Sequence, residues 1–287
     1  MSKLTFYVTL SFLLVLSACV TIPRKHLTVT QRGGFSVVQE AGNCDIDPYK
    51  NILQSNPAQK TELDSGGFRI LNWNVSKGMK KGWQVDFNKL IASHDILTIQ
   101  EARLTDDLRE LLEKAHYNWD ISIAFKYNGQ ETGVLTASKI APDFTCTFRT
   151  REPLVSLPKT VMVTKYPLSN TDKTLMVVNI HSVNFTLGTG SFYNQLQKVE
   201  HIISQHYGPV ILSGDVNTWS NKRMAILKDL SIRMGLKVVA FNKHNQTRIF
   251  GHATDHIYYR ELTLTDAAVI KVNSSDHNPM LVSFKLL

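Results

Sequence analysis

The chain has few cysteines, no dense cluster of metal-binding side chains and only one long apolar run. Three of its 287 residues are cysteine and ten are histidine, and no group of them has the close spacing that a zinc site prefers. Beyond the first twenty residues, charged residues interrupt every apolar run, so no later segment is expected to span a bilayer. No internal repeat is evident. The sequence therefore predicts a body that lies in solvent, without a zinc centre.

The composition is that of an ordinary globular protein with an excess of positive charge. Hydrophobic residues make up 43% of the chain and charged residues 20%, and the length suits one large domain or two small ones. The formal charge of +8 and the isoelectric point near 9.3 favour an anionic partner. Nucleic acid, a phosphorylated small molecule and an acidic membrane surface all fit this charge.

The first nineteen residues have the pattern of a secretory leader. Lys3 gives a basic start, residues 4–16 are apolar, and Leu-Ser-Ala-Cys follows at 16–19. This ending resembles a bacterial lipobox, which predicts lipidation of Cys19 and a membrane anchor there. Val20 behind it resembles the pattern that is sorted to the outer membrane. A plain signal peptide cut nearby and an uncleaved anchor remain alternatives.

The next segment, residues 20–67, differs from the rest of the chain. It is rich in Gly, Pro, Asn, Gln and Ser and has weak periodicity, which predicts a tether and a surface arm. The expected catalytic body is therefore 68–287. With Cys19 set aside, Cys44 and Cys146 remain, and an oxidising compartment would let them pair.

From residue 68 onward, strand and helix patterns alternate. Helices are predicted near 87–91, 196–203 and 224–234, and another is predicted over 106–115 with Thr105 as its N-cap. The predicted strands are 68–75, 96–99, 120–125, 133–138, 144–149, 160–166, 174–180, 210–213, 255–259, 262–271 and 280–284. Because several strands follow one another without a helix, we expect β-sheets covered by helices rather than a regular βαβ array.

Polar side chains gather where the predicted strands end. The stretch L-S-G-D-V-N-T-W-S puts Asp215 and Asn217 directly after a buried strand, although Gly, Asp and Asn also form ordinary turns. The other residues of this kind are Asn74, Glu101, His181, Asn184, Asp255, Asp276 and His277. Several buried carboxylates without partners would be expensive, so a cation is expected among them.

The residue types select the cation. The carboxylates of Glu101 and Asp276 and the amide oxygen of Asn74 are hard oxygen donors, which suit Mg²⁺ or Mn²⁺. His181 and His277 are better used on the substrate, because an imidazole can donate a hydrogen bond to a phosphate oxygen.

Six short motifs occur in a characteristic order. W-N, Q-E, N-I-H, G-D-V-N, D-H-I-Y and S-D-H-N-P lie between residues 68 and 287. This order resembles the endonuclease/exonuclease/phosphatase superfamily, which includes DNase I, repair exonucleases, inositol polyphosphate 5-phosphatases and bacterial sphingomyelinases. The resemblance is nearest to a bacterial branch with G-D-x-N-x-W-S. It implies an α/β (α+β) fold, a four-layer sandwich of two packed mixed β-sheets flanked by helices.

The resemblance also implies a metal site and a base. Glu101 corresponds to the principal metal ligand, with Asn74 and Asp276 close to the ion. Asp215 corresponds to the group that orients and deprotonates the attacking water, and Asn217 to the residue that holds it in place.

The remaining motif residues are implied to act on the phosphate. His277 corresponds to the donor to the scissile phosphate and Asp255 to the carboxylate that fixes its tautomer, unless Asp255 only forms a surface turn. His181 and Asn184 together combine residue types that are typical of two different subfamilies. Arg103, just past the Q-E motif, is a candidate phosphate contact.

Together these features predict a metal-dependent phosphodiester hydrolase, with nucleic acid as the first candidate substrate. A phosphatase or phospholipase C-like enzyme on lipid or sugar phosphates is the alternative, and a tethered, non-catalytic binding protein is a third. We expect a monomer outside the cytoplasm, either anchored as an outer-membrane or periplasmic lipoprotein through Cys19 or secreted.

Overall fold

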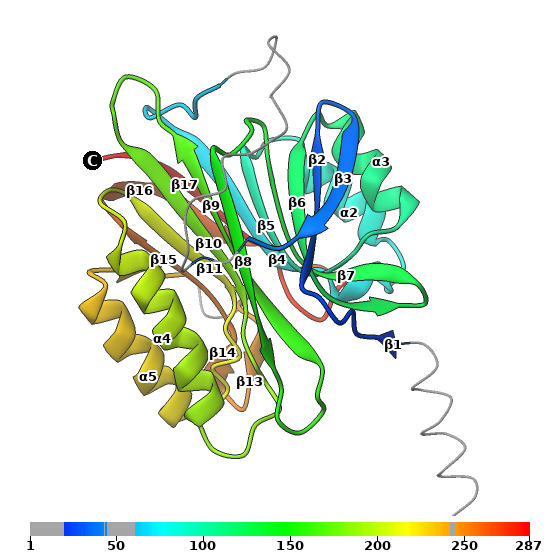
Figure 1. Ribbon diagram of the computed structural model, residues 1–287. Helices are drawn as coiled ribbons and strands as arrows, with labels where there is room; N and C mark the ends of the chain where they lie inside the picture. Colours follow the sequence, from blue (N-terminus) through cyan, green and yellow to red (C-terminus); the bar gives the residue numbers. More distant parts are fainter. Residues whose placement is uncertain (1–19, 43, 45–60, 242–244) are drawn as a thin grey trace, which may run out of the picture.

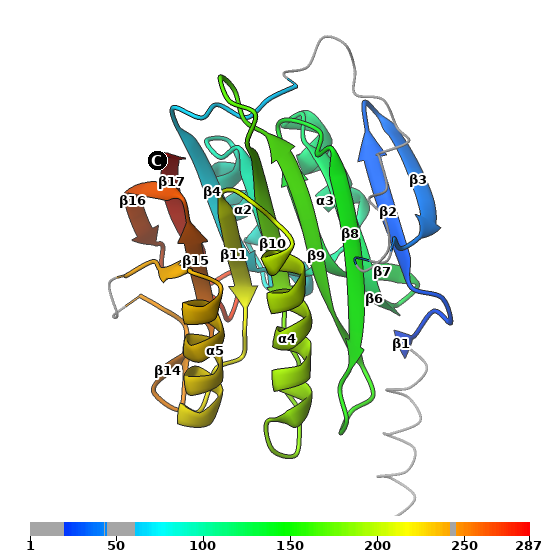
Figure 2. The same cartoon turned by 60° about the vertical axis from the view of Figure 1, so that its left-hand side comes forward.

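Two β-sheets pack face to face, and helices cover their outer faces (Figures 1 and 2). The computed structural model describes residues 20–42, 44, 61–241 and 245–287. The larger sheet has nine strands and the smaller has six, and a two-stranded ribbon stands apart. The predicted four-layer α+β architecture is thus confirmed.

The larger sheet has the order β16-β17-β4-β5-β7-β6-β2-β3, with β1 paired to β6. In chain order its strands are β1 (Val20–Thr21), β2 (Leu27–Arg32), β3 (Phe35–Glu40), β4 (Phe68–Asn74), β5 (Ile96–Arg103), β6 (Asn118–Tyr127), β7 (Gln130–Ser138), β16 (Leu262–Val269) and β17 (Met280–Leu286). Only β4 and β5 run parallel in it.

The smaller sheet has the order β12-β15-β11-β10-β9-β8. Its strands are β8 (Phe144–Arg151), β9 (Pro158–Pro167), β10 (Thr174–His181), β11 (Val210–Asp215), β12 (Lys237–Val238) and β15 (Asp255–Arg260), and the separate ribbon is β13 (Arg248–Ile249) with β14 (His252–Ala253). Here β10 and β11 are the parallel pair.

Each of the two main sheets has a pair of helices packed on its outer face. α2 (Trp83–Ile91) and α3 (Asp106–Lys114) pack on the larger sheet, and α4 (Gly190–Ser204) and α5 (Asn221–Arg233) pack on the smaller one. Thr105 caps α3 by accepting a hydrogen bond from the Leu108 amide, as its sequence position predicts. A third apolar cluster fills the space between the sheets and includes Ile70, Val177 and Ile211. This core fixes the central strands of one sheet against those of the other.

The predicted arm over residues 20–67 is partly built into the body. β2 and β3 extend the larger sheet, and the Arg32 guanidinium is buried against the Asp120 carboxylate of β6 at 2.5 Å. Weak periodicity misled the sequence interpretation here because β3 is almost fully exposed and shows no buried face. The boundary predicted at Phe68 therefore separates strands that belong to one sheet.

A disulfide joins Cys44 to Cys146 of β8, with the α-carbons 5.2 Å apart. The pairing considered from the sequence is therefore present. The predicted signal peptide, 1–19, and Cys19 lie outside the described residues. Within the described part of the chain, no helix has the length and apolar character needed to cross a membrane.

Candidate active site

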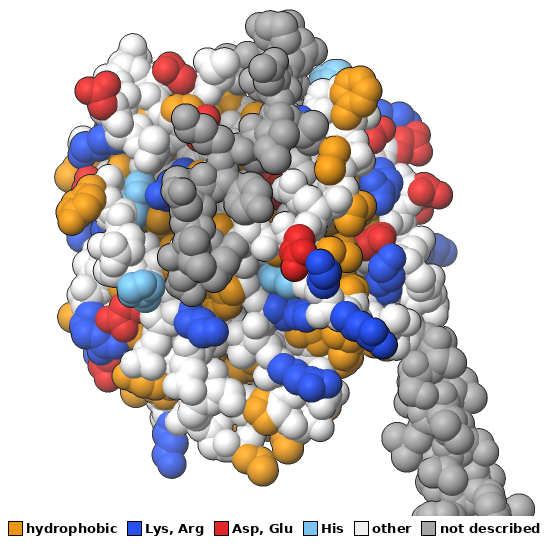
Figure 3. Space-filling view, viewed as in Figure 1, with side chains coloured by type: hydrophobic (Ala, Val, Ile, Leu, Met, Phe, Trp, Pro, Cys, Tyr) orange, Lys and Arg blue, Asp and Glu red, His pale blue; other side chains and the backbone are white. Residues whose placement is uncertain are grey.

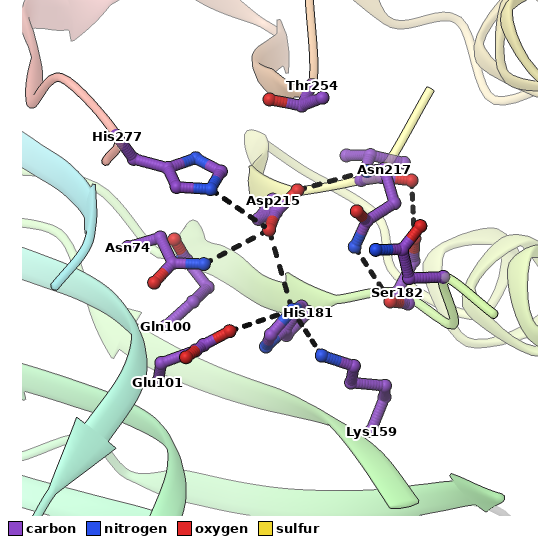
Figure 4. Close-up of polar contacts among 12 residues, drawn as sticks. Asn74, Gln100, Glu101, Lys159, His181, Ser182, Asp215, Asn217, Thr254 and His277 are labelled. Carbon is purple, nitrogen blue, oxygen red and sulfur yellow. Dashed lines mark hydrogen bonds and ion pairs between the residues drawn. The ribbon is translucent and has the colours of Figure 1, made fainter. Parts of the chain in front are cut away.

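The predicted site residues meet at one end of the sandwich, where central strands of both sheets finish. Asn74 ends β4, His181 ends β10 and Asp215 ends β11, while Asp255 opens the antiparallel neighbour β15. His277 lies in the loop that leads into β17. Strands that are adjacent across the core thus bring together side chains that lie up to about two hundred residues apart in sequence (Figure 4).

The G-D-V-N turn is shaped by two unusual backbone positions. Gly214 has a φ of +150°, and a Cβ added there would lie 1.9 Å from the Ile180 carbonyl oxygen of β10. Asn217 adopts the left-handed region with a φ of +55°. Its backbone amide donates to Asp215 Oδ1 at 3.1 Å, and its side-chain amide donates to the Ser182 carbonyl at 3.1 Å. The stretch is therefore a turn, and the turn holds the Asp215 carboxylate in place.

Asp215 is the centre of the polar network. Its Oδ2 atom accepts from the Asn74 amide at 3.1 Å and lies 3.4 Å from His181 Nε2 and 3.9 Å from His277 Nε2 (Figure 4). The side chain is buried, and burial raises the pKa of Asp215 above its ordinary value, with the Asp255 carboxylate acting in the same direction and the imidazoles opposing it. Asp215 is thus a stronger base than an exposed aspartate.

His277 forms a dyad with Asp255. Its Nδ1 atom lies 2.8 Å from Asp255 Oδ2, which also accepts from the Thr254 hydroxyl at 3.0 Å. Burial alone would lower the pKa of His277, but the Asp255 and Asp215 carboxylates outweigh burial and raise it to about 10. The Trp73 indole donates to the His277 carbonyl at 2.8 Å and so fixes the loop. The ring is therefore an oriented imidazolium whose Nε2–H is free of Asp255.

Glu101 sits at a break in the β5 ladder. The pairing of β5 with β7 shifts register between Ile99 and Ala102, and Glu101 has a φ of +50°. Such a bulge re-aims a side chain, and the carboxylate forms an ion pair with Lys77 and lies 3.9 Å from His181 Nε2. Burial would raise the pKa of Glu101, but His181 and the nearby ammonium groups lower it to about 2. Glu101 is thus ionised in the site.

Lys159 is a site residue that the sequence analysis missed. Its ammonium group lies 2.7 Å from His181 Nε2 and donates to that nitrogen. Burial first, and then the Lys159 charge, lower the pKa of His181 to about 3, so the ring is neutral. Nothing in the sequence separates this lysine, near the start of β9, from an ordinary surface lysine. The same holds for Lys77, in the loop after β4, whose ammonium group pairs with Glu101.

Three predicted residues contact other partners. Asn184 Oδ1 accepts from the Trp219 indole at 2.8 Å, so its side chain helps to hold its own loop. The Arg103 guanidinium lies over the Tyr127 ring, 6.0 Å from its centroid. Asp276 is exposed and accepts from the Ser275 hydroxyl at 3.3 Å. The contacts of Asn184 and Arg103 do not join the network around Asp215, whereas Asp276 also hydrogen-bonds with Ser76 beside Asn74 and interacts with the charge of His277. The proposed phosphate contact of Arg103 and the metal role of Asp276 stay predictions.

The donor set fits a hard divalent cation. Glu101 offers a carboxylate near Asp215, while Asn74 turns its amide nitrogen to Asp215 and accepts from the Ser76 amide with its oxygen at 3.0 Å. One ligand atom each of Asp215, Asp255 and His277 lie within 4.8 Å of one another. Because Asp255 and His277 are hydrogen-bonded to each other, Glu101, whose Oε1 is not paired with Lys77, and the second lone pair of the Asn74 oxygen are the better candidates for ligands. Oxygen donors of this kind are typical of Mg²⁺ or Mn²⁺ and not of zinc.

A small cavity opens beside the network. Its volume is about 220 Å³, and Glu101, Lys159 and His181 line one side of it while Leu157 and Phe185 line another. A larger cavity of about 610 Å³ lies near Arg69 at the opposite end of β4 and contains none of the site residues. His181, which lines the smaller cavity, lies 3.4 Å from Asp215, so the smaller cavity is the one that adjoins the network.

Comparison with known proteins gives one consistent result. Residues 71–277 match the model of the Endonuclease/Exonuclease/phosphatase family. A UPF0294 protein of Vibrio campbellii is 35% identical over 267 residues, covering 93% of this chain and 90% of that protein. A UPF0294 protein of Yersinia pseudotuberculosis is 38% identical over 264 residues, covering 92% and 100%.

A solved structure shows the same fold. The endonuclease/exonuclease/phosphatase protein from Beutenbergia cavernae superposes with a TM-score of 0.60 over 77% of this chain and 72% of its own. Its sequence identity is 12%. At that identity the likeness concerns the fold and says nothing of the substrate.

Proposed function

The chain belongs to the endonuclease/exonuclease/phosphatase family, and from this premise we propose that it is a divalent-metal-dependent hydrolase of phosphodiesters. Proteins of this family and fold are generally phosphoester hydrolases. The observation that carries the proposal is the convergence of Asn74, His181 and His277 on the buried carboxylate of Asp215. A binding protein has no need to hold a base and an imidazolium 3.9 Å apart in one buried network.

Asp215 orients and deprotonates the attacking water. Its raised pKa makes it a better base than an exposed aspartate, and the amides of Asn74 and Asn217 fix the direction of its oxygens. A fixed base adds positional advantage to proton transfer.

His277 donates to the phosphate. Asp255 holds its Nδ1–H, so Nε2–H points toward the reacting group and its positive charge offsets the charge that develops on a nonbridging oxygen. On the opposite side, the Lys159 ammonium, which donates to Nε2 of the neutral His181 ring, offers a further cationic donor beside Glu101.

A divalent cation held by Glu101 and Asn74 would supply further neutralisation of the phosphate charge. The Lys77 ammonium already forms an ion pair with Glu101, so metal binding must displace or share this contact.

A substrate panel tests the proposal. We expect Mg²⁺- or Mn²⁺-dependent hydrolysis of a soluble chromogenic diester, bis(p-nitrophenyl) phosphate, that a chelator abolishes and that Glu101→Gln weakens at low metal concentration. Plasmid DNA and phospholipid vesicles, assayed in parallel, separate the nuclease prediction from the lipid-phosphate alternative. Inactivity on all substrates, together with no metal-induced rise in Tm, would instead support a tethered binding protein.

A further inference from the structure

The mouth of the active site carries large exposed apolar side chains. Leu154 is 54% exposed, Phe185 53%, Leu187 83% and Phe250 83%. With Val155, which is 44% exposed, they form what we term the apolar rim. Val155 and Phe185 line the cavity. Single exposed apolar residues are normal on soluble proteins, but a cluster beside a cavity marks a contact surface.

The rim residues come from three loops that are joined by hydrogen bonds and an aromatic contact. The Leu154 amide, between β8 and β9, donates to the Phe185 carbonyl, between β10 and α4, at 3.4 Å. Phe250, at the tip of the β13–β14 ribbon, lies edge-on to Trp219 with the ring centroids 6.3 Å apart, and Trp219 is bonded to Asn184 in the second loop. Both ribbon views place the three loops at the same end of the molecule (Figures 1 and 2).

The same loops are almost free of negative charge. Residues 151–159, 182–190 and 245–253 contain Arg151, Lys159 and Arg248 but a single carboxylate, Glu152, which is 1% exposed. Figure 3 shows hydrophobic side chains along the lower edge of this face, with Lys and Arg side chains around them. Apolar side chains surrounded by positive charge match the interface of an anionic bilayer.

The chain enters the fold on this side. Val20 of β1 pairs with Tyr127 of β6, and Phe125, two residues earlier on β6, lines the cavity beside Glu101 and Lys159. The predicted anchor, Cys19, directly precedes Val20. A lipid attached to Cys19 would therefore orient the cavity toward the membrane rather than away from it.

We propose that the apolar rim docks on an anionic lipid bilayer and that the substrate is a phosphodiester of a membrane lipid whose headgroup enters the 220 Å³ cavity. The proposal rests on the proposed hydrolase function and names its substrate class. Water oxygen bonds to phosphorus, one ester P–O bond breaks, Asp215 takes a water proton and the leaving alkoxide takes a proton to become an alcohol. Three of the five rim side chains, Leu154, Val155 and Leu187, are aliphatic and offer no ring for a base to stack on, which favours lipid over nucleic acid.

A fluorescent label tests the docking without relying on activity. In the full chain with Cys19→Ser, which removes the predicted lipid attachment point, an environment-sensitive dye is attached at Leu187→Cys or, as the control, at Ile232→Cys. Ile232 is 64% exposed and lies near the far end of α5. With phosphatidylglycerol–phosphatidylethanolamine vesicles we expect a blue shift and brighter emission at 187 only, weakened by salt. No change at 187, or equal changes at both positions, overturns the proposal.

An activity comparison tests the substrate class. The double variant Leu154→Ser/Leu187→Ser is expected to lose about tenfold or more of its turnover on vesicle phosphatidylglycerol and to keep that on bis(p-nitrophenyl) phosphate. The matched control, Tyr207→Ser/Ile232→Ser, removes exposed apolar side chains from the opposite end and should lose neither. Cleavage of plasmid DNA without cleavage of vesicle lipid overturns the lipid assignment. Inactivity of the wild type on the soluble diester contradicts the hydrolase function instead, and the labelling result then stands alone.

Discussion

At the scale of single residues, the site depends on how the surroundings change ordinary side chains. An exposed aspartate is a weak base and an exposed histidine is mostly neutral at pH 7. Burial raises the pKa of Asp215, and the Asp255 carboxylate with Asp215 raises that of His277 to about 10, so the two groups take opposite roles in one network. His181, beside Lys159, has its pKa lowered to about 3 and stays neutral. Pairs of groups with pKa values driven apart are typical of acid–base sites.

Asp215→Asn and His277→Ala test these two roles. Each variant should lower turnover of the soluble diester at least about a hundredfold, the lower range of general acid–base effects. Urea unfolding should show that both variants remain folded. If either keeps most of its activity, the role assigned to that residue is wrong.

Gly214→Ala tests the close approach of β10 and β11. The added methyl group would meet the Ile180 carbonyl oxygen, so we expect a loss of about 3 kcal/mol or more in the free energy of unfolding, with displacement of Asp215. Gly129→Ala is the matched control, because Gly129 also has a positive φ but has open space around it. Equal losses in the two variants would show that backbone strain, not the contact with β10, is responsible.

At the scale of elements, the N-terminal strands β1 to β3 are part of the larger sheet. They are held by side chains that reach both sheets. His26 Nε2 lies 2.9 Å from the Ser122 hydroxyl of β6 and 3.4 Å from the Thr147 hydroxyl of β8. Burial first, and then the Arg149 charge, lower the pKa of His26 to about 4. The attachment of this segment should therefore depend on pH.

The pH dependence has a definite sign. Between pH 6.5, the ordinary value, and about 4, the unfolded chain binds the His26 proton and the folded chain does not, so stability falls as the pH falls. Replacing His26 by Gln should remove on the order of 2 kcal/mol of this loss, allowing for the partial exposure of the ring. Urea unfolding of both proteins at several pH values measures the difference. Parallel stability curves for the two proteins would exclude a contribution from His26.

At the scale of the whole molecule, the two sheets present the ends of their central strands at one edge. The apolar rim, the cavity and the entry point of the chain at Val20 lie on this edge, while the larger cavity near Arg69 lies at the other end. The molecule thus has one chemically distinctive end, and an anchor at the predicted Cys19 would determine how that end meets a membrane.

The anchor can be tested in bacterial cells with the full chain. Wild-type protein should incorporate radiolabelled palmitate and fractionate with membranes, and Cys19→Ser should lose the label, because the sulfur is the predicted attachment point. Cys146→Ser, which removes a cysteine of the disulfide, should keep it. A wild-type protein without label would favour a plain signal peptide or an uncleaved anchor.

The sequence by itself determined the class of fold and most members of the site. Apolar periodicity located β4 to β11, β15 to β17 and the four α-helices of the described residues, since a buried face leaves a repeating pattern, but it did not locate the two-residue strands β12, β13 and β14. The motif residues Asn74, Asp215, Asp255 and His277 stood out because polar groups directly after apolar runs are unusual. The exposed strand β3 could not be found in this way, because it buries no face.

Only the tertiary structure decided which of these residues meet and what else meets them. Lys159 and Lys77 contact the site residues His181 and Glu101. Asn184 and Arg103 instead contact Trp219 and Tyr127. A lysine, an arginine or an exposed leucine has the same local pattern wherever it lies, so its neighbours across the fold decide its role. Contacts between distant segments depend on strand order and on bulges such as that at Glu101, and these are set by the packing of the two sheets rather than by any local stretch of sequence.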